Sequence, residues 1–139
     1  MADAVTSQTL SDGDKTAVIK LTNLSDGTGE SSVQKIDVSG LTTNQAGETC
    51  TRVSIQQIWY DIGGMRVSLE WAASSNVNIL ALGGSAAAGN VQGHMDFRSF
   101  GGLKNTEASG VDGDVDLTTS GHTNLDHYSI ILELKKKYT

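Results

Sequence analysis

The sequence contains no proline, a single cysteine and few aromatic residues, with two Trp, three Tyr and two Phe among 139 residues. Because proline stiffens turns and protects exposed sheet edges, the turns must depend on the 16 glycines and on Asn and Asp. Some sheet edges are then expected to be occupied by another subunit. Cys50 has no partner for an internal disulfide, and the opening Met1-Ala2-Asp3 is unlike a secretory leader. We therefore expect synthesis in a reducing cytoplasm.

Long apolar runs and clustered positive charge are also scarce. The longest apolar runs, residues 77–82 and 130–132, are far shorter than the roughly 20 residues that span a bilayer, so we expect no membrane partner. The formal net charge of -6 argues against a nucleic-acid partner, because phosphate binding requires a cationic surface. The one basic cluster, Lys135-Lys136-Lys137, is either a solvated end that protects a terminal strand or a contact with an acidic neighbouring surface.

Period-two alternation of apolar and polar residues predicts most of the strands. Residues 16–22 and 34–39 alternate in this way, and residues 77–82 form an apolar run of strand length. Residues 25–30 are rich in turn-forming side chains and glycine, which predicts a hairpin loop.

The strongest alternation occupies residues 51–60 and 65–71, on either side of Gly63-Gly64. Two alternating runs around such a turn predict a β-hairpin. The pattern also places Trp59 and Trp71 at core-like positions, so we expect both indoles to be buried or nearly so.

No helical periodicity lasts for more than two turns, whereas about eight short strands alternate with turn signals. The sequence therefore predicts an all-β protein, a single-domain antiparallel β-sandwich or jelly-roll-like fold spanning residues 1–139. Residues 1–14 either pair as an edge strand or extend as an N-terminal arm.

The segment Asp112-Gly113-Asp114-Val115-Asp116 has the carboxylate spacing of a calcium loop. It has Leu117 where that loop needs glycine and Thr123 where it needs glutamate. As a strand, the segment would place Asp114 and Asp116 on a solvent face. We expect no calcium site here.

Other candidate chemistry also lacks the residues that it requires. His94, His122 and His127 are accompanied by one distant cysteine, which is a poor set for structural zinc. No serine lies in a nucleophile elbow, no glycine-rich loop has the phosphate-binding pattern, and Cys50 is interpreted as a small core or edge residue. We expect no enzymatic activity, metal or cofactor.

A carbohydrate platform is an open alternative, because aromatic side chains stack on sugar faces. Since both tryptophans occupy core-like positions, the residues to suspect for such a platform are Tyr60, Tyr128 and Tyr138.

Four blocks of the chain resemble small virion structural proteins of marine tailed bacteriophages. They are MADAVTSQ (residues 1–8), KLTNLSDGTGE (20–30), FRSFGGL (97–103) and the ending from GDVDLTT (113–119) to Lys137-Tyr138. The resemblance implies a non-enzymatic protein that is made in the host cytoplasm and placed on the capsid surface. Its role would be that of a head decoration or cement protein, binding the major capsid protein as a homo-oligomer, with a trimer as the usual form.

The resemblance carries no functional residues onto this chain, so the candidate interface comes from the residues themselves. A reaching arm, a loop of small side chains, a Phe-Gly-Gly-Leu segment and the basic cluster suggest Val5, Leu10, Ala86, Ala87, Phe100, Leu103, Lys135, Lys136 and Lys137. For Phe100 and Leu103 the alternative is ordinary core. Two rival roles remain open: a neck or tail component, and a fibre or glycan-binding host-recognition module.

Overall fold

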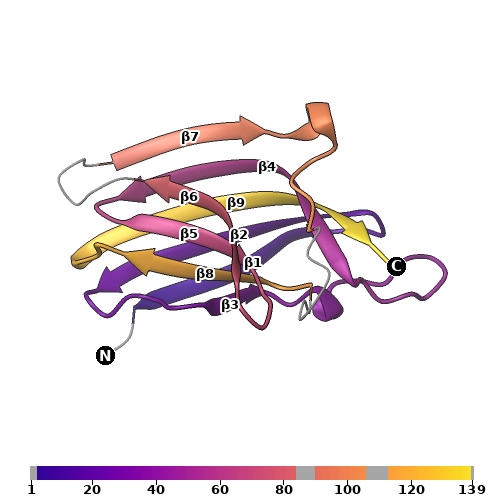
Figure 1. Cartoon of the computed structure of the whole chain (residues 1–139), viewed down its shortest axis with the longest axis horizontal. Helices are drawn as coiled ribbons and strands as arrows, with labels where there is room; N and C mark the ends of the chain where they lie inside the picture. Colours follow the sequence, from indigo (N-terminus) through magenta and orange to yellow (C-terminus); the bar gives the residue numbers. More distant parts are fainter. Residues whose placement is uncertain (1–2, 84–89, 106–112, 139) are drawn as a thin grey trace.

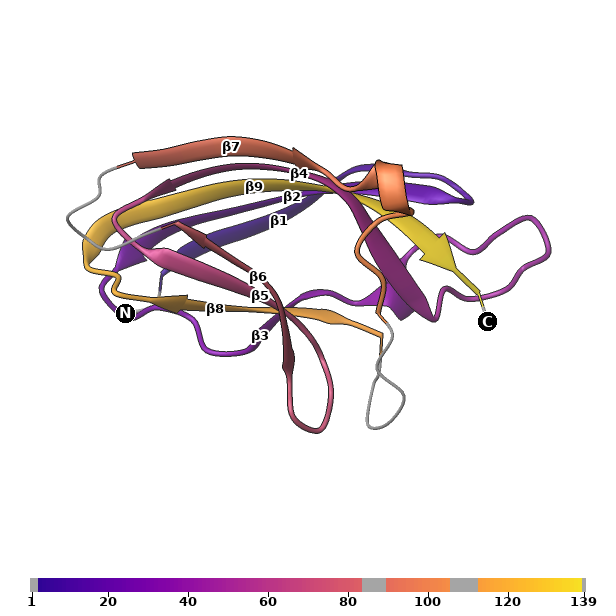
Figure 2. The same ribbon diagram turned by 45° about the horizontal axis from the view of Figure 1, so that its top comes forward.

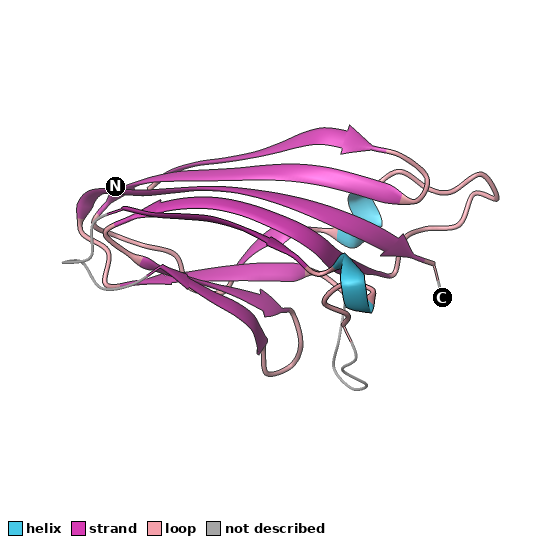
Figure 3. Ribbon diagram, turned by 90° about the horizontal axis from the view of Figure 1, so that it is seen from above, coloured by secondary structure: helices cyan, strands magenta, loops and turns pink. Residues whose placement is uncertain are grey.

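The computed structural model describes residues 3–83, 90–105 and 113–138. These residues form two facing antiparallel sheets (Figures 1 and 2). The strands are β1 (Ala4–Asp12), β2 (Thr16–Asp26), β3 (Val33–Ile36), β4 (Arg52–Gly63), β5 (Arg66–Trp71), β6 (Val77–Gly83), β7 (Asn90–Asp96), β8 (Val115–Ser120) and β9 (Asn124–Lys137). Two short 3-10 turns, Val38–Gly40 and Arg98–Phe100, are the helical segments of this described part (Figure 3). Neither is long and apolar enough to cross a membrane.

The strand order is that of a jelly roll with one added strand. One sheet has the order β1-β2-β9-β4-β7 and the other β3-β8-β5-β6. The pairs β2 with β9, β3 with β8, β4 with β7 and β5 with β6 are nested, as in one long antiparallel ribbon rolled into two sheets. The predicted all-β sandwich is confirmed. Within the described part of the chain, the first strand, β1, pairs only with β2 and lies at the edge of the larger sheet.

The core lies between the sheets and follows the alternation of the strands. In β2 the exposed fractions of Ala17, Ile19 and Leu21 are 0%, 4% and 0%, as the period-two pattern predicts. Residues from the other strands complete one apolar cluster that includes Ile36, Val53, Ile55, Ile58, Ile62, Val67, Leu69, Trp71, Leu82, Val115, Leu117, Ile130, Leu132 and Leu134.

Two predicted hairpins are wrong, although the strands that flank them are present. The Gly63-Gly64 turn joins β4 in the five-stranded sheet to β5 in the four-stranded sheet, so these strands do not pair. The turn after β2 likewise crosses to β3 in the opposite sheet. Glycine marks where a chain reverses, but pairing in a rolled ribbon is decided by strands far away in sequence.

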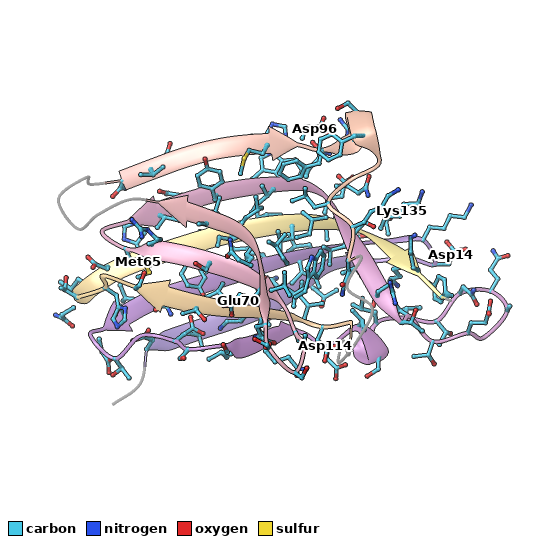
Figure 4. All side chains as sticks on the ribbon, viewed as in Figure 1. Asp14, Met65, Glu70, Asp96, Asp114 and Lys135 are labelled. Atoms are coloured by element: carbon cyan, nitrogen blue, oxygen red, sulfur yellow. The ribbon has the colours of Figure 1, made fainter. Side chains whose placement is uncertain are left out.

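Asp114 is buried, which corrects its expected place on a solvent face. Its Oδ1 accepts a hydrogen bond from the Val38 backbone N–H at 2.9 Å, and its Oδ2 accepts from Gln34 Nε2 at 2.6 Å. The carboxylate therefore fastens the 3-10 turn and β3 to the start of β8 (Figure 4). Asp116 is half-buried, and Val115 and Leu117 are buried as predicted.

Candidate functional site

Trp59 lies on the outer face of the five-stranded sheet with 37% of its surface exposed, so its expected burial is wrong. The cause is a β-bulge between Ile55 and Gln57, where β4 shifts register against β9. An extra residue reverses which side chains point inward, and Ile58 and Ile62 replace the odd-numbered positions in the core. Near Trp71 the register also shifts, but the extra residue lies in β6 and not in β5, so Trp71 keeps its inward face and is only 5% exposed.

The sequence does carry a signal for this bulge. The apolar positions of β4 change from odd numbers, Val53 and Ile55, to even numbers, Ile58 and Ile62. Two consecutive glutamines, Gln56 and Gln57, stand at the change. A change of the apolar positions from odd to even numbers, with adjacent polar residues at the change, indicates a β-bulge. Reading the whole run as one regular alternation misses it.

The Trp59 indole stacks on the imidazole of His94, its partner on β7, with ring centroids 4.9 Å apart and planes 12° apart. Gln57 holds the imidazole in place. The Gln57 Nε2 donates to Glu133 Oε2 at 2.9 Å, which leaves Gln57 Oε1 to accept from His94 Nε2 at 2.9 Å. A relay across three strands thus fixes the orientation of the two stacked rings.

A hollow of about 550 Å³ lies beside the stacked rings on this outer face. Residues paired across neighbouring strands form rows on this face of the sheet. One row consists of the large side chains Lys20, Ile131, Trp59 and His94, and the next row includes the small side chain of Ser129, which leaves space beside the rings. Tyr60 and its partner Gly93 belong to the row between these two; the Tyr60 side chain packs against the core, so this row forms the floor of the hollow.

The far wall of the hollow is polar and contains Asp61 and Gln92, which are partners across β4 and β7. Asp61 Oδ1 is buried and accepts no hydrogen bond from any described residue. An unsatisfied carboxylate oxygen in this position is costly, and a donor group brought by a ligand would satisfy it.

The second candidate surface is the free edge of β1. Every residue from Ala4 to Ser11 is exposed, and no lysine or arginine lies in the strand. Ala4–Thr9 pair with β2 in unbroken register, and the bulge comes only afterwards, with Leu10 left out of the pairing. Such an edge presents unpaired backbone N–H and C=O groups for another strand to join.

The other edges of the two sheets are better protected. β3 has four residues and includes Lys35, whereas β7 contains His94 and Asp96. β6 is uncharged, but a bulge interrupts its pairing with β5 near its middle. Short length, charge and central bulges all discourage further strand pairing. β1 is therefore the edge best suited to strand addition.

Both ends of β1 are fastened, so the N-terminal segment is an edge strand and not a free arm. At its start, Asp3 accepts hydrogen bonds from Asn23 Nδ2 at 3.1 Å and from the backbone N–H groups of Asp26 at 3.1 Å and Gly29 at 3.2 Å. Desolvation raises the pKa of Asp3, but these hydrogen bonds outweigh it and lower the pKa to about 2.

At the other end of β1, Asp12 is ion-paired with Lys136. Lys136 Nζ also donates to the carbonyl oxygens of Gly13 at 2.5 Å and Thr42 at 2.9 Å, and its side chain is fully buried. The expected solvated end is therefore wrong for Lys136. Its neighbours Lys135 and Lys137 are exposed, and Lys135 lies beside Asp14 at the same end of the molecule (Figure 4).

A third polar cluster is buried between the sheets at the opposite end. Glu30 Oε1 accepts from Asn23 Nδ2 at 2.6 Å and from the Tyr128 hydroxyl at 2.7 Å, while its other oxygen is paired with Lys35. Burial and the Glu30 hydrogen bond strongly raise the pKa of Tyr128. Because both carboxylate oxygens have partners and the charged side chains are 5% exposed, this cluster joins strands and offers no open reactive group.

The predicted interface residues fall into separate places. Val5 and Leu10 are exposed on β1 at 45% and 49%, whereas Phe100 is 61% exposed beyond β7, at the opposite edge of the sheet. The core alternative is therefore wrong for Phe100. Leu103 is half-buried and forms an isolated bridge with Ile55. Ala86 and Ala87 lie outside the described residues.

The residues singled out for chemistry are also dispersed. Among the described residues, no three His, Cys, Asp or Glu side chains form a group that could hold a metal ion. Cys50 is buried, as expected, and desolvation raises the pKa of its thiol. Of the suspected aromatic residues, Tyr128 is buried and Tyr138 donates to the Asp14 carbonyl oxygen. Tyr60 is half-buried and lines the hollow, but its side chain packs against the core. The exposed ring of the platform is that of Trp59, which the sequence places in the core.

Comparison of the chain with protein-family models, curated proteins and solved structures gives no match.

Proposed function

We propose that this protein is a non-enzymatic structural protein of a virion, a capsid decoration or cement protein that binds the major capsid protein. The observation that carries the proposal is the free edge of β1, which is exposed, without basic residues and fastened at both ends. A rigid edge of this kind adds a strand from a partner without the entropic cost of ordering an arm.

Two further features support the same role. The jelly-roll order is used by viral capsid domains, although it is also used by lectins and therefore bears on fold more than on function. Among these possibilities, the resemblance of four sequence blocks to virion proteins of marine tailed bacteriophages favours the capsid role. As that resemblance implies, we propose that the protein occupies the head surface as a homo-oligomer, with a trimer as the expected form.

A cement protein acts by burying additional surface between neighbouring capsomers, so each bound copy stabilises the assembled shell by mass action. The capsid partner would extend the five-stranded sheet beyond β1. The exposed Val5 and Leu10 side chains would then be covered by the partner.

Lysine substitutions on the edge strand test this proposal. Val5→Lys with Ser7→Lys introduces charge into the regularly paired part of β1 and should reduce binding to heads that lack the protein by at least tenfold in a co-sedimentation assay. Leu24→Lys with Leu125→Lys adds the same charge at residues that are 50% and 66% exposed and should bind normally. Equal binding of both variants would contradict docking through β1.

A further inference from the structure

We infer that the hollow beside Trp59 binds a pyranose ring of a neutral glycan, a site separate from the β1 edge and independent of the capsid role. The volume of about 550 Å³ lies within the range of roughly 300–1,000 Å³ that small-molecule sites occupy. The class of ligand follows from the two walls, which differ in chemistry.

The first wall is apolar and rigid. Trp59 and Ile131 are partners across β4 and β9, and the relay from Glu133 through Gln57 fixes the His94 ring against which the indole stacks. Preorganised aromatic surface binds without a large entropic cost. The C–H face of a sugar ring presents a flat apolar surface that matches this wall.

The opposite wall supplies hydrogen-bonding groups. Asp61 faces Ser129 and Gln92 across the neighbouring strands, and its Oδ1 has no hydrogen-bond partner among the described residues. The last torsion of an aspartate side chain is broad, so the carboxylate turns easily toward a ligand. Two neighbouring hydroxyl groups of a sugar would donate to its oxygens, and Lys20 at the hollow would donate to a ring or hydroxyl oxygen.

Other classes of ligand fit these walls less well. A nucleic acid needs several cationic contacts, whereas the hollow has Lys20 opposite Asp61. A divalent cation needs several oxygen ligands, and the described residues form no such group around Asp61. An extended peptide would pair with the free backbone of a sheet edge, whereas this hollow opens on the outer face of the sheet, over β2, β9, β4 and β7. A small molecule with one apolar face and several hydroxyl groups would stack on the aromatic wall and donate hydrogen bonds to the polar wall.

Saturation-transfer NMR and tryptophan fluorescence test the site with four defined probes: the methyl glycosides of glucose, galactose, mannose and N-acetylglucosamine. We expect at least one probe to show saturable binding up to about 20 mM, as for a site with a Kd of about 1 mM. Binding should shift the emission of exposed Trp59 and protect it from acrylamide, while buried Trp71 is unaffected.

Variants decide whether the signal arises in the hollow. Trp59→Ala should weaken binding at least tenfold, and the nearly isosteric Asp61→Asn should weaken it about tenfold because a charge-assisted hydrogen bond is lost. Val18→Ala, on the same sheet face but outside the hollow, should bind as the wild type. The absence of saturable binding for all four probes, or binding that survives in both Trp59→Ala and Asp61→Asn, would overturn the inference.

Discussion

Asp12 at the end of β1 is ion-paired with Lys136 of β9, although β2 lies between these two strands in the sheet. The lysine extends past the first residue of β2, Thr16, and also donates to the carbonyl oxygens of Gly13 and Thr42. One buried ammonium group thus joins the first strand, the turn after it, the loop before β4 and the last strand. It holds the proposed docking edge in a fixed position.

Replacing Lys136 should therefore cost far more than replacing its neighbours. Lys136→Ala leaves Asp12 and two carbonyl oxygens without their donor, and breaking a buried ion pair costs about 3 kcal/mol of unfolding free energy. Lys135→Ala and Lys137→Ala remove the same charge from exposed positions and should each cost less than about 0.5 kcal/mol. Urea unfolding measures all three. Similar losses for the three variants would show that Lys136 is not the fastening residue.

The two carboxylates that hold β1 should make its attachment sensitive to acid. Hydrogen bonds lower the pKa of Asp3 to about 2 against an ordinary 3.8, and those from Lys136 and Thr42 outweigh desolvation to lower the pKa of Asp12. A pKa that is lower in the folded state stabilises the fold above the ordinary pKa, and this contribution is lost as the pH falls through the folded pKa.

The expected window for this loss is about pH 4 to pH 2. The double variant Asp3→Asn with Asp12→Asn should be less stable than the wild type at pH 7, and the difference between the two proteins should shrink across that window. Urea unfolding of both proteins at a series of pH values measures this difference in unfolding free energy. The other acidic residues are the same in both proteins, so their contributions cancel in the difference. A difference that stays constant from pH 7 to pH 2 would argue against these carboxylates as the fastening groups.

Two glycines with similar φ angles allow two costs of a substitution by alanine to be measured separately: the steric overlap of the new Cβ and the strain of the left-handed backbone. Gly113 has φ +85° and Gly47 has φ +82°, but a Cβ at Gly113 would overlap the Thr51 carbonyl oxygen, whereas nothing lies within 4 Å of a Cβ at Gly47. Gly47→Ala should cost about 1 kcal/mol for its left-handed conformation. Gly113→Ala should cost about 3 kcal/mol, because the overlap is added. Equal costs in thermal unfolding would mean that the Thr51 segment moves away freely.

The Tyr128 hydroxyl should support folding through its hydrogen bond to Glu30. Tyr128→Phe removes one donor and leaves Asn23 and Lys35 on the carboxylate, so the expected cost is about 1 kcal/mol. Because the pKa of this phenol is strongly raised in the folded state, its contribution is present below the ordinary pKa of 10 and is lost as the pH rises. Ultraviolet titration should show Tyr128 ionising only with unfolding; ionisation in the folded protein would contradict its burial against Glu30.

The sequence predicted the strands well and their partners poorly. In β2, which has a regular alternation, Ala17, Ile19 and Leu21 all lie on the inward face. The period-two pattern alone therefore identifies the core residues of this strand. The alternation misplaces Trp59, because one extra residue in β4 reverses the faces after Ile55. Alternation assigns each residue to a face from its neighbours, so an unrecognised bulge reverses the assigned face of every later residue in the strand.

Burial of charged residues was the other failure, and it has a different cause. Lys136 and Asp114 are buried because partners from distant segments meet them: Asp12 and Thr42 for the lysine, and Val38 for the aspartate. Such partners become neighbours only when the ribbon is rolled into two sheets. The candidate hollow depends on the same long-range register, since β4 and β7 bring Asp61 beside Gln92.

Cryo-electron microscopy of intact particles, combined with quantitative protein gels, tests the proposed role most directly. The account predicts hundreds of copies spread over the head, with capsid density that continues the five-stranded sheet beyond β1. A few copies confined to the tail vertex, or a head-bound copy whose β1 edge faces solvent, would contradict it.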